Sequence, residues 1–502
     1  MAITNGNSLN KVPAAQQQAL ASNYIDFTDG STGWEQQYLP DLMEKEAEVF
    51  GNRTVSGFLS QVGAEEASAS DQVVWSEQSR LHLSYIGTID LDGDTNGTFT
   101  VVSDIDGLTA SDSPAFTPAS HGIRVNDVVL LASAGYVSKC LVVETPDSAV
   151  VSLEAYGEAV LTNHSETASA ATLLVIGSHY GKGQSYSDIT GTAASSSRRA
   201  LEPTFKSYGN QMQIMKDYYA VSGSDASQVG WVEVTGEEGQ SGYLWYLKAE
   251  GDTRARFTDY LEMTMLEAEK SAAASIIGFA DGQIRGSADA GANGVGTQGL
   301  FDAIEKRGNL TSGVTGVNAA TDLAEFDAIL AEFDNQGAIE ENMMFVNRAT
   351  SLAMDDMLAS MNSYGAGGTS YGVFDNSEDM ALNLGFSGFR RGSYDFYKSD
   401  WKYLNDKATR GKINSTATSA AIRGAIIPAG VSSVYDQALG KNMKRPFLHV
   451  RYRASNTESR KFKTWVTGSV GATTSALDAM EIHMLSERCL VTQGANNFML
   501  MK

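Results

Sequence analysis

The stretch YGNQMQIMKDYYAVSG, Tyr208–Gly223, decides how the rest of this 502-residue sequence is interpreted. Its composition predicts an extended, strand-like segment bounded by turns. A polar loop with Gly236, Gly239 and Gly242 follows, and the pattern then changes to that of one long helix. The residues upstream predict an arm, a loop and a β-rich insert, and those downstream predict a body of helices and strands.

The composition is that of a globular protein, with 42% apolar and 19% charged residues. A chain of this length can hold two to four ordinary domains and bury a substantial core. Its 37 basic and 60 acidic residues give a net charge of −23. Such an acidic surface favours solubility and does not attract nucleic acid, which is bound through Lys and Arg.

Nothing in the sequence indicates an oxidising compartment or a membrane. The two cysteines, Cys140 and Cys489, allow one disulfide at most, and the simpler expectation is a disulfide-free protein made in a reducing cytoplasm. The first residues lack the apolar region of a secretory signal. No apolar run approaches the roughly 18 residues of a membrane span.

The first part of the chain predicts an arm followed by a β module. Residues 1–30 are polar, a short helix is expected near Pro40–Phe50, and extended structure begins at Val73. Residues 85–185 have a period of two, with a hairpin signal at Asn96-Gly97. Several short strands at this spacing predict a small barrel or sandwich inserted into the chain. The further strands are expected at Ile123–Leu131, Val137–Glu144, Ala149–Leu153 and Thr172–Ile176.

The long helix is expected over 252–280, with Asp252-Thr253 as its N-cap and Asp281-Gly282 after its end. Apolar residues recur along it every three or four positions, which predicts one buried stripe. At 1.5 Å per residue this helix would be roughly 40 Å long. The stripe consists of Phe257, Leu261, Met265, Ala268, Ala272 and Ile276.

The remaining segments alternate between helices and strands without regular βαβ repeats, so an α+β fold is expected. A helix is predicted over Leu300–Lys306, and a second begins where Asp322 and Glu325 resemble a capping box. A further helix is expected over Ala349–Met361. The predicted strands are Met343–Val346, Ala425–Ile427, Phe447–Tyr452, 480–484 and Arg488–Thr492.

Three glycine-rich motifs resemble ligand sites but lack the required context. GVGTQG at Gly294–Gly299 matches a dinucleotide fingerprint, yet a loop precedes it instead of a buried strand. Gly177–Gly183 has one residue too few between its glycines for a phosphate loop. Asp92, Asp94 and Asn96 match the first half of a calcium loop, but Ser103 stands where the bidentate Glu is needed. A hinge and two turns are the preferred interpretations, and a weak calcium site at the third stays open.

No residue is nominated as catalytic, cofactor-binding or metal-ligating, and no cofactor is expected. Neither C-x-x-C nor H-E-x-x-H nor G-x-S-x-G occurs, although a dispersed Ser-His-Asp site is not excluded by sequence. The six histidines are scattered, and His449 and His483 are expected to alternate outward from strands. An enzyme is therefore not the expectation.

The order of these parts resembles the major capsid proteins of tailed bacteriophages, which have the Hong Kong 97 fold. The resemblance covers most of the chain from about residue 70 onward. It is carried by VVWSEQSRL at Val73–Leu81, TFKSYGNQMQIMKDYYAVSG at Thr204–Gly223, the helix over 252–280, GLFDAIEKRGN at Gly299–Asn309 and AIIPAGVSSVYD at Ala425–Asp436.

The resemblance implies a division of the chain. Residues 1–70 would be the N-terminal arm, 71–225 an extended loop carrying the β module, and 226–299 a peripheral domain with the helix over 252–280 as its spine. Residues 300–440 would form the axial domain. The C-terminal strands over 441–502 would return to both domains. The inserted β module departs from the minimal family pattern and would decorate the shell or contact neighbours.

The resemblance also implies a function: self-assembly into pentamers and hexamers of an icosahedral head shell. Partners would be the chain itself, portal and scaffolding proteins, decoration or head–tail proteins, and packaged double-stranded DNA through non-specific inner-face contacts. Synthesis would occur in the host cytoplasm, with no membrane partner. Residues Trp75, Met212 and Ile214 would then be covered by neighbouring subunits.

Basic clusters in the C-terminal third are interpreted as solvated faces and intersubunit ion pairs, with a local basic face towards DNA as the alternative. They comprise Arg390-Arg391, Lys441–Arg445, Arg451, Arg453, Arg460, Lys461 and Lys463.

Two other classes of function remain. A virion or surface adhesin would use the β module to bind carbohydrate. Tandem β modules without a central helical body would favour this interpretation, and the sequence has none. A cytoplasmic hydrolase would need a convergent site that no motif offers. The long helix and the dispersed extended segments favour the capsid subunit.

Overall fold

The computed structural model divides the chain into two compact units, Val74–Gly209 and the residues on either side of it, up to Val73 and from Asn210 to Lys502. It describes residues 64–502 apart from short gaps and five longer ones, at 184–204, 225–233, 236–240, 271–295 and 364–387. The predicted arm up to residue 63 and the helix near Pro40–Phe50 lie outside the described residues. The shorter gaps are 79, 81, 94, 108, 110, 112–115, 134, 148, 158–160, 165–170, 243, 338, 430, 437–440 and 470–473.

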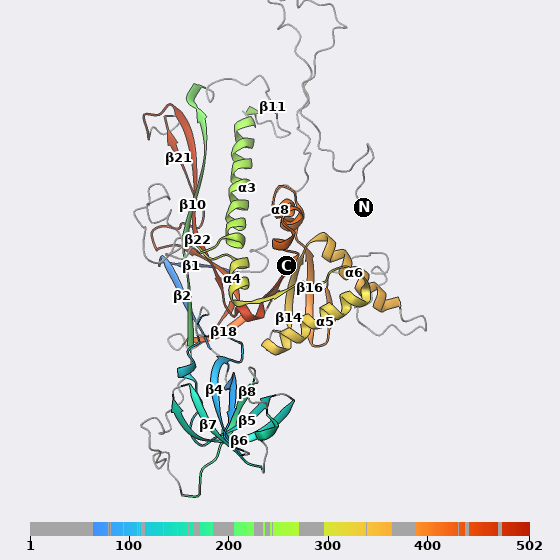
Figure 1. Cartoon of the computed structure of the whole chain (residues 1–502). Coiled ribbons are helices and arrows are strands. Elements are labelled where there is room, and N and C mark those ends of the chain that lie inside the picture. Colours follow the sequence, from blue (N-terminus) through green and yellow to red (C-terminus); the bar gives the residue numbers. More distant parts are fainter. Residues whose placement is uncertain are drawn as a thin grey trace, which may run out of the picture. The chain divides into compact units, whose positions relative to one another are not determined.

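The unit Val74–Gly209 contains a closed six-stranded barrel, drawn in blue and teal in Figure 1. Alternate residues of its strands point inward, so that Phe99, Leu131 and Leu173 are buried in one core while their neighbours face solvent. The barrel order is β3-β4-β7-β6-β5-β8. The strands are β3 (Ser84–Leu91), β4 (Asn96–Asp104), β5 (Asp127–Ser133), β6 (Tyr136–Asp147), β7 (Val150–Ala155) and β8 (Ala171–Ser178).

Strands β2 (Gln72–Gln78) and β9 (Phe205–Gln211) pair with each other and flank the barrel in sequence. The Trp75 ring lies 6.4 Å from that of Tyr208, and its indole N–H donates to Glu77 at 3.0 Å. Trp75 is therefore buried within the single chain. The expectation that only a neighbouring subunit would cover it is wrong, because the partner strand already does so.

The other unit has two sheets, and the first has five strands with the order β1-β20-β22-β10 and β21 paired to β22. The sequence predicts two strands over its C-terminal part, but β22 is one continuous strand of 14 residues. Its first part pairs with β10 on one side and β21 on the other, and its last residues pair with β20. The bounds are β1 (Ala64–Ser68), β10 (Gln213–Ser222), β20 (Leu448–Arg453), β21 (Lys463–Gly468) and β22 (Ala479–Thr492).

Helix α3 (Leu244–Glu267) lies beside β10 and β22 (Figure 1). Its Phe257 and Leu261 pack with Met484 of β22 and Met215 of β10. Because inward-facing residues alternate along a strand, α3 covers one face of this sheet and leaves the opposite face uncovered by the helix.

The predicted span 252–280 for this helix is wrong at both ends. The helix begins eight residues earlier, so Asp252 and Thr253 lie inside it, and Ala268–Lys270 are no longer helical. The end coincides with a close approach: the Gly299 N–H donates to the Ala268 carbonyl at 2.7 Å. A Cβ on Gly299 would lie 2.8 Å from the backbone of Leu266, so only glycine fits without displacement. Ala272 and Ile276 fall outside the described residues.

The second sheet has six strands in the order β13-β23-β17-β14-β16-β15, with both parallel and antiparallel neighbours. Helices α5 (Ala319–Gln336) and α6 (Arg348–Ser363) bury Phe326 and Met354 against it. The architecture is α+β, which confirms the predicted class. The strands are β13 (Asn309–Thr311), β14 (Glu341–Val346), β15 (Gly388–Arg391), β16 (Tyr394–Asp400), β17 (Gly424–Pro428) and β23 (Met499–Met501).

Smaller elements complete this unit. The short helices are α4 (Leu300–Arg307), α7 (Lys402–Asn405) and α8 (Arg410–Thr416). The remaining strand pairs are β11 (Val234–Thr235) with β12 (Ser241–Gly242), and β18 (Val431–Asp436) with β19 (Lys441–Pro446).

The predicted capping box at the start of α5 is also wrong. Asn318 is the N-cap, and its side chain accepts from the Thr321 N–H at 3.0 Å. Asp322 and Glu325 accept instead from the backbone N–H groups of Gly316 and Thr315, at 2.8 and 2.7 Å. These two carboxylates therefore hold the preceding loop against the first turns of α5. Their spacing resembles that of a capping box, but the N-cap is Asn318.

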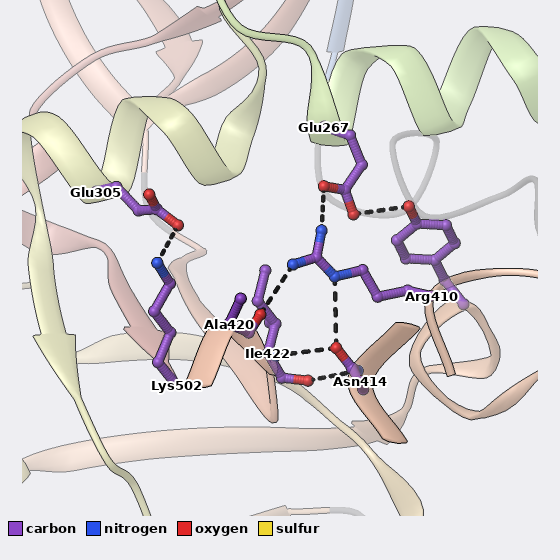
Figure 2. A network of polar contacts seen from close by, with 8 residues as sticks. Glu267, Glu305, Arg410, Asn414, Ala420, Ile422 and Lys502 are labelled. Carbon is purple, nitrogen blue, oxygen red and sulfur yellow. Dashed lines mark hydrogen bonds and ion pairs between the residues drawn. The ribbon is translucent and has the colours of Figure 1, made fainter. Parts of the chain in front are cut away.

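A polar clasp joins the end of α3 to α7, α8 and the turn that precedes β17 (Figure 2). The Arg410 guanidinium pairs with the Glu267 carboxylate and donates to the Ala420 carbonyl at 3.1 Å. Tyr403 donates to the other oxygen of Glu267 at 2.8 Å. Burial and the Glu267 charge raise the pKa of Tyr403, so the phenol stays a donor. The clasp fixes where the long helix ends relative to the strand that follows Ile422.

The two thiols provide a direct test of this fold. Cys140 in the barrel and Cys489 in β22 are both free and buried, and burial raises their pKa to about 11 and about 12. We expect neither to react with Ellman's reagent in the folded protein at about pH 8, because the thiolate is the reactive form. Both should react at once in denaturant. Rapid labelling of either thiol in the native protein would contradict the described packing.

Candidate functional site

The described part of the dinucleotide-like motif, Gly296–Gly299, holds the side chain of one asparagine. Asn210 is 1% exposed, and its amide accepts from the Gln298 N–H at 2.8 Å and donates to the Gln298 carbonyl at 3.0 Å. The same amide donates to the Leu490 carbonyl at 2.7 Å, and Thr297 donates to its oxygen at 3.2 Å. Asn210 therefore ties the end of β9 to the residues just before α4 and to β22. The arrangement is that of a structural junction.

The other two motifs form turns at strand ends. Gly93 has φ +95° in the β3–β4 hairpin, where the Asp92 N–H donates to the Asn96 carbonyl at 3.0 Å. His179 follows β8 and its Nδ1 lies 2.9 Å from the Tyr156 hydroxyl. Asp94 and the residues after Gly183 fall outside the described part, so the proposed calcium loop is not tested there. Among the described residues no group of three His, Cys, Asp or Glu could hold a metal ion.

The histidines divide between core and surface positions. His449, expected to point outward, is 2% exposed, so that expectation is wrong. His164 is buried in the barrel with Ser133 and Ser138 hydroxyls 2.7 Å from its two ring nitrogens. Burial lowers the pKa of His164, so the imidazole between these two hydroxyls is favoured in its neutral form.

The C-terminal basic residues have acidic partners within the same chain. Arg451 pairs with Glu66 at 2.9 Å, and Arg460 with Glu487 at 2.5 Å. These residues therefore have acidic partners in the single chain already, and the interpretation of the basic clusters as solvated faces and intersubunit ion pairs stays a prediction. The remaining pairs are Arg453 with Asp71 and Glu487, Lys461 with Glu65, and Lys463 with Glu458.

The sheet face opposite α3 carries a row of three rings across neighbouring strands. Tyr218 of β10 pairs in register with His483 of β22, and His483 with Trp465 of β21. Their ring centroids are 6.1 and 5.3 Å apart and the planes are nearly parallel. Cross-strand aromatic pairs of this kind stabilise a sheet and fix its register.

His483 is oriented by a short polar chain on the same face. Its Nε2 lies 2.7 Å from the Thr467 hydroxyl, which donates to Glu481 at 3.2 Å. Since that hydroxyl donates to the carboxylate, it accepts from the imidazole, and Nε2 carries the hydrogen. The ring is thereby held between its two aromatic neighbours.

This face leaves apolar area in solvent. Tyr218 is 61% exposed, Ile214 52% and Trp465 36%. On β10 only Val221 is fully buried, while the exposed and half-buried residues alternate. Ile214, which the resemblance leaves to be covered by a neighbouring subunit, is exposed in the single chain, whereas Asn210 of the same stretch is buried. The sequence reasoning missed the ring row, because its three members lie far apart in the chain.

In the part of the chain that the structure describes, no helix is both long and apolar enough to cross a bilayer.

No family model and no curated protein matches the sequence. Among solved structures, the chain is similar to one from Microbacterium phage Oxtober96, at 7% identity over 93% of this chain and 97% of that one, with TM-score 0.38. It is similar to a chain of the capsid of a native GTA particle, at 10% identity over 96% and 98%, with TM-score 0.37. A chain of the Cyanophage Pam1 capsid covers 65% and 81% at 10% identity, with TM-score 0.33. Since all three TM-scores are below 0.5, the proposal that follows rests on the geometry of the chain itself.

The Asn210 junction is testable by substitution. Asn210→Ala removes the partners of the Gln298 amide and of the Leu490 carbonyl, so we expect the free energy of unfolding to fall by about 2–4 kcal/mol. Urea denaturation followed by circular dichroism measures this change. Asn456→Ala, at an exposed position, is the matched control and should change it by less than about 0.5 kcal/mol. Equal stability of the two variants would contradict the junction.

Proposed function

We propose that this chain is a structural protein and not an enzyme, namely the major capsid protein of a tailed bacteriophage with a Hong Kong 97-type fold. One observation carries the proposal: the two faces of β10 have opposite environments. Met215 packs beneath α3, whereas Ile214 and Tyr218 stay in solvent on the other face. The long helix covers one face of the sheet, and the other face exposes aromatic rings. Such an exposed face is expected in a subunit whose neighbours cover it in an assembly.

In this proposal the five-stranded sheet with α3 forms the peripheral domain, and the six-stranded sheet with α5 and α6 forms the axial domain. The barrel sits in the extended loop, between β2 and β9 of its own unit. Pentamers and hexamers would close an icosahedral shell around DNA, with portal, scaffolding and decoration proteins as further partners. The virion is the proposed location.

Burial on assembly supplies the driving force. Covering a large apolar side chain fully is worth roughly 1.5–3 kcal/mol, so the exposed rings and Ile214 can contribute several kcal/mol per subunit. The occupant proposed for this face is a second copy of the chain. The net charge of −23 makes copies repel at long range, so short-range apolar contact is the attractive term that the described surface offers.

Electron microscopy of the purified, overexpressed full chain tests the function. We expect shells, tubes or capsomer rings, because a self-assembling subunit at high concentration closes symmetric contacts. A monodisperse monomer under all salt and concentration conditions would contradict the proposal.

A surface substitution tests which face makes the contact. We expect Tyr218→Lys to abolish assemblies in sedimentation velocity while leaving the thermal unfolding midpoint within a few degrees of the parent, since the side chain is 61% exposed. Tyr260→Lys is the control, because Tyr260 is 44% exposed on α3, away from this face. Normal assembly of the Tyr218→Lys variant would show that the contact between copies lies on another surface.

A further inference from the structure

A cavity of about 430 Å³ lies at the N-terminal end of α6, in the unit that contains the six-stranded sheet. The first turns of α6 form one wall, and the loop 314–316 and Arg423 form the other. Sites for small molecules have volumes of about 300–1,000 Å³. The cavity is therefore large enough to hold a small organic molecule.

Hydrogen bonds within the chain fix the walls of this cavity. Two carboxylates of α5 hold the loop 314–316 through its backbone N–H groups, at 2.7 and 2.8 Å. The backbone of Arg423 is held on both sides, since its N–H donates to the Met501 carbonyl and its carbonyl accepts from the Asn347 N–H, both at 2.8 Å. A cavity with walls held in this way is preformed, so a ligand that enters it pays little for ordering the protein.

Hydrogen-bond donors converge on the end of the cavity where α6 begins. Thr350 lines the cavity and is 4% exposed, yet its hydroxyl has no partner among the residues that the structure describes. Asn347 caps the helix by accepting from the Thr350 N–H at 2.8 Å, which leaves its amide NH₂ group as a donor. The Ala349 N–H belongs to the first turn and has no acceptor within the helix. Such a set of donors at a helix N-terminus suits an anion.

The guanidinium of Arg423 adds a positive charge to the same cavity. It donates to the Ser312 carbonyl at 3.0 Å, and no carboxylate pairs with it in the described part of the chain. Arg451 and Arg460, in contrast, are paired with acids. A guanidinium with unused donors binds carboxylates and phosphates well. Because this is a single cation in a chain of net charge −23, a singly charged carboxylate is favoured over a doubly charged phosphate.

A negative group lies two helical turns farther along the same wall. Asp356 is exposed, lines the cavity and follows Ala349 by seven positions, which is roughly 10 Å along α6. Leu352 and Ala353 lie between them and supply apolar surface. A ligand that fills the cavity therefore meets donors and a cation at one end, methyl groups in the middle and a carboxylate at the other end.

We propose that this cavity binds a small amino carboxylate. Its carboxylate would lie against Arg423, Thr350 and the N-terminus of α6, and its ammonium group would face Asp356. A simple carboxylate satisfies only the first end of the cavity, and a simple amine only the second. The inference goes beyond the proposed function, since the site lies within the single chain and requires no shell.

Three probes of equal carbon length test the site in the unassembled full chain. 6-Aminohexanoate carries both charges, hexanoate only the carboxylate and hexylamine only the ammonium. We expect 6-aminohexanoate to raise the thermal unfolding midpoint most, because a ligand that binds the folded state stabilises it by mass action. In calorimetric titrations at constant ionic strength, its dissociation constant should be about threefold below that of hexanoate, as expected for one partly exposed ion pair.

Two substitutions assign the two ends. Thr350→Val keeps the side-chain shape and removes the hydroxyl, so both carboxylates should bind about tenfold more weakly. The unfolding midpoint without ligand should not fall, because this hydroxyl loses no partner. Asp356→Asn should bring the dissociation constants of 6-aminohexanoate and hexanoate together. Arg390→Gln is the control: it removes an exposed guanidinium of β15 outside the cavity and should change neither constant.

The proposal is overturned if 6-aminohexanoate does not bind, or if it binds the Thr350→Val variant as tightly as the parent. Tighter binding of inorganic phosphate, or an unchanged preference in the Asp356→Asn variant, would also contradict it. The titrations use unassembled protein, so a failure here leaves the proposed shell function standing. Binding of the probe by a chain that never forms shells would contradict only the shell.

Discussion

The structure of the larger unit depends on the continuity of β22. This strand runs unbroken from Ala479 to Thr492, and it pairs first with β10 and β21 and then with β20. Its early residues therefore support the ring row and the contact with α3, while Leu490 belongs to the core shared with Phe498 and Leu500 near the second sheet. Because one strand serves both regions, the sheet face and the six-stranded sheet are parts of one folded body.

Two polar contacts connect other segments to this strand and to the end of α3. Asn210 is hydrogen-bonded to the backbone at Gln298 and Leu490, and Arg410 neutralises Glu267 where α3 ends. Both groups are buried or half-buried, so each must be satisfied in full. Gly299 occurs where the chain crosses the end of α3, because a Cβ there would lie 2.8 Å from the backbone of Leu266. Close packing therefore accounts for Gly299, the last glycine of the motif.

The sequence predicted the classes of structure well and their boundaries poorly. Period-two residues between 85 and 185 predicted a barrel or sandwich, because alternation in a strand is a local property. The span of α3 was wrong because its termination is tertiary, set by Gly299 against Ala268. The ring row escaped prediction since Tyr218, His483 and Trp465 become neighbours only through register. Likewise, the acids that neutralise Arg451 and Arg460 could not be paired with them from the sequence.

Charge and apolar contact act in opposite senses in this chain. With a net charge of −23, and with Arg451 and Arg460 already paired to acids of the same chain, the surplus charge is acidic and copies repel at long range. Salt screens that repulsion beyond a Debye length of about 8 Å at physiological ionic strength, and it also weakens exposed ion pairs such as those of β1. The ring row on the outer sheet face is insensitive to salt. Screening of charge by salt therefore weakens the repulsion between copies without weakening the apolar character of this face.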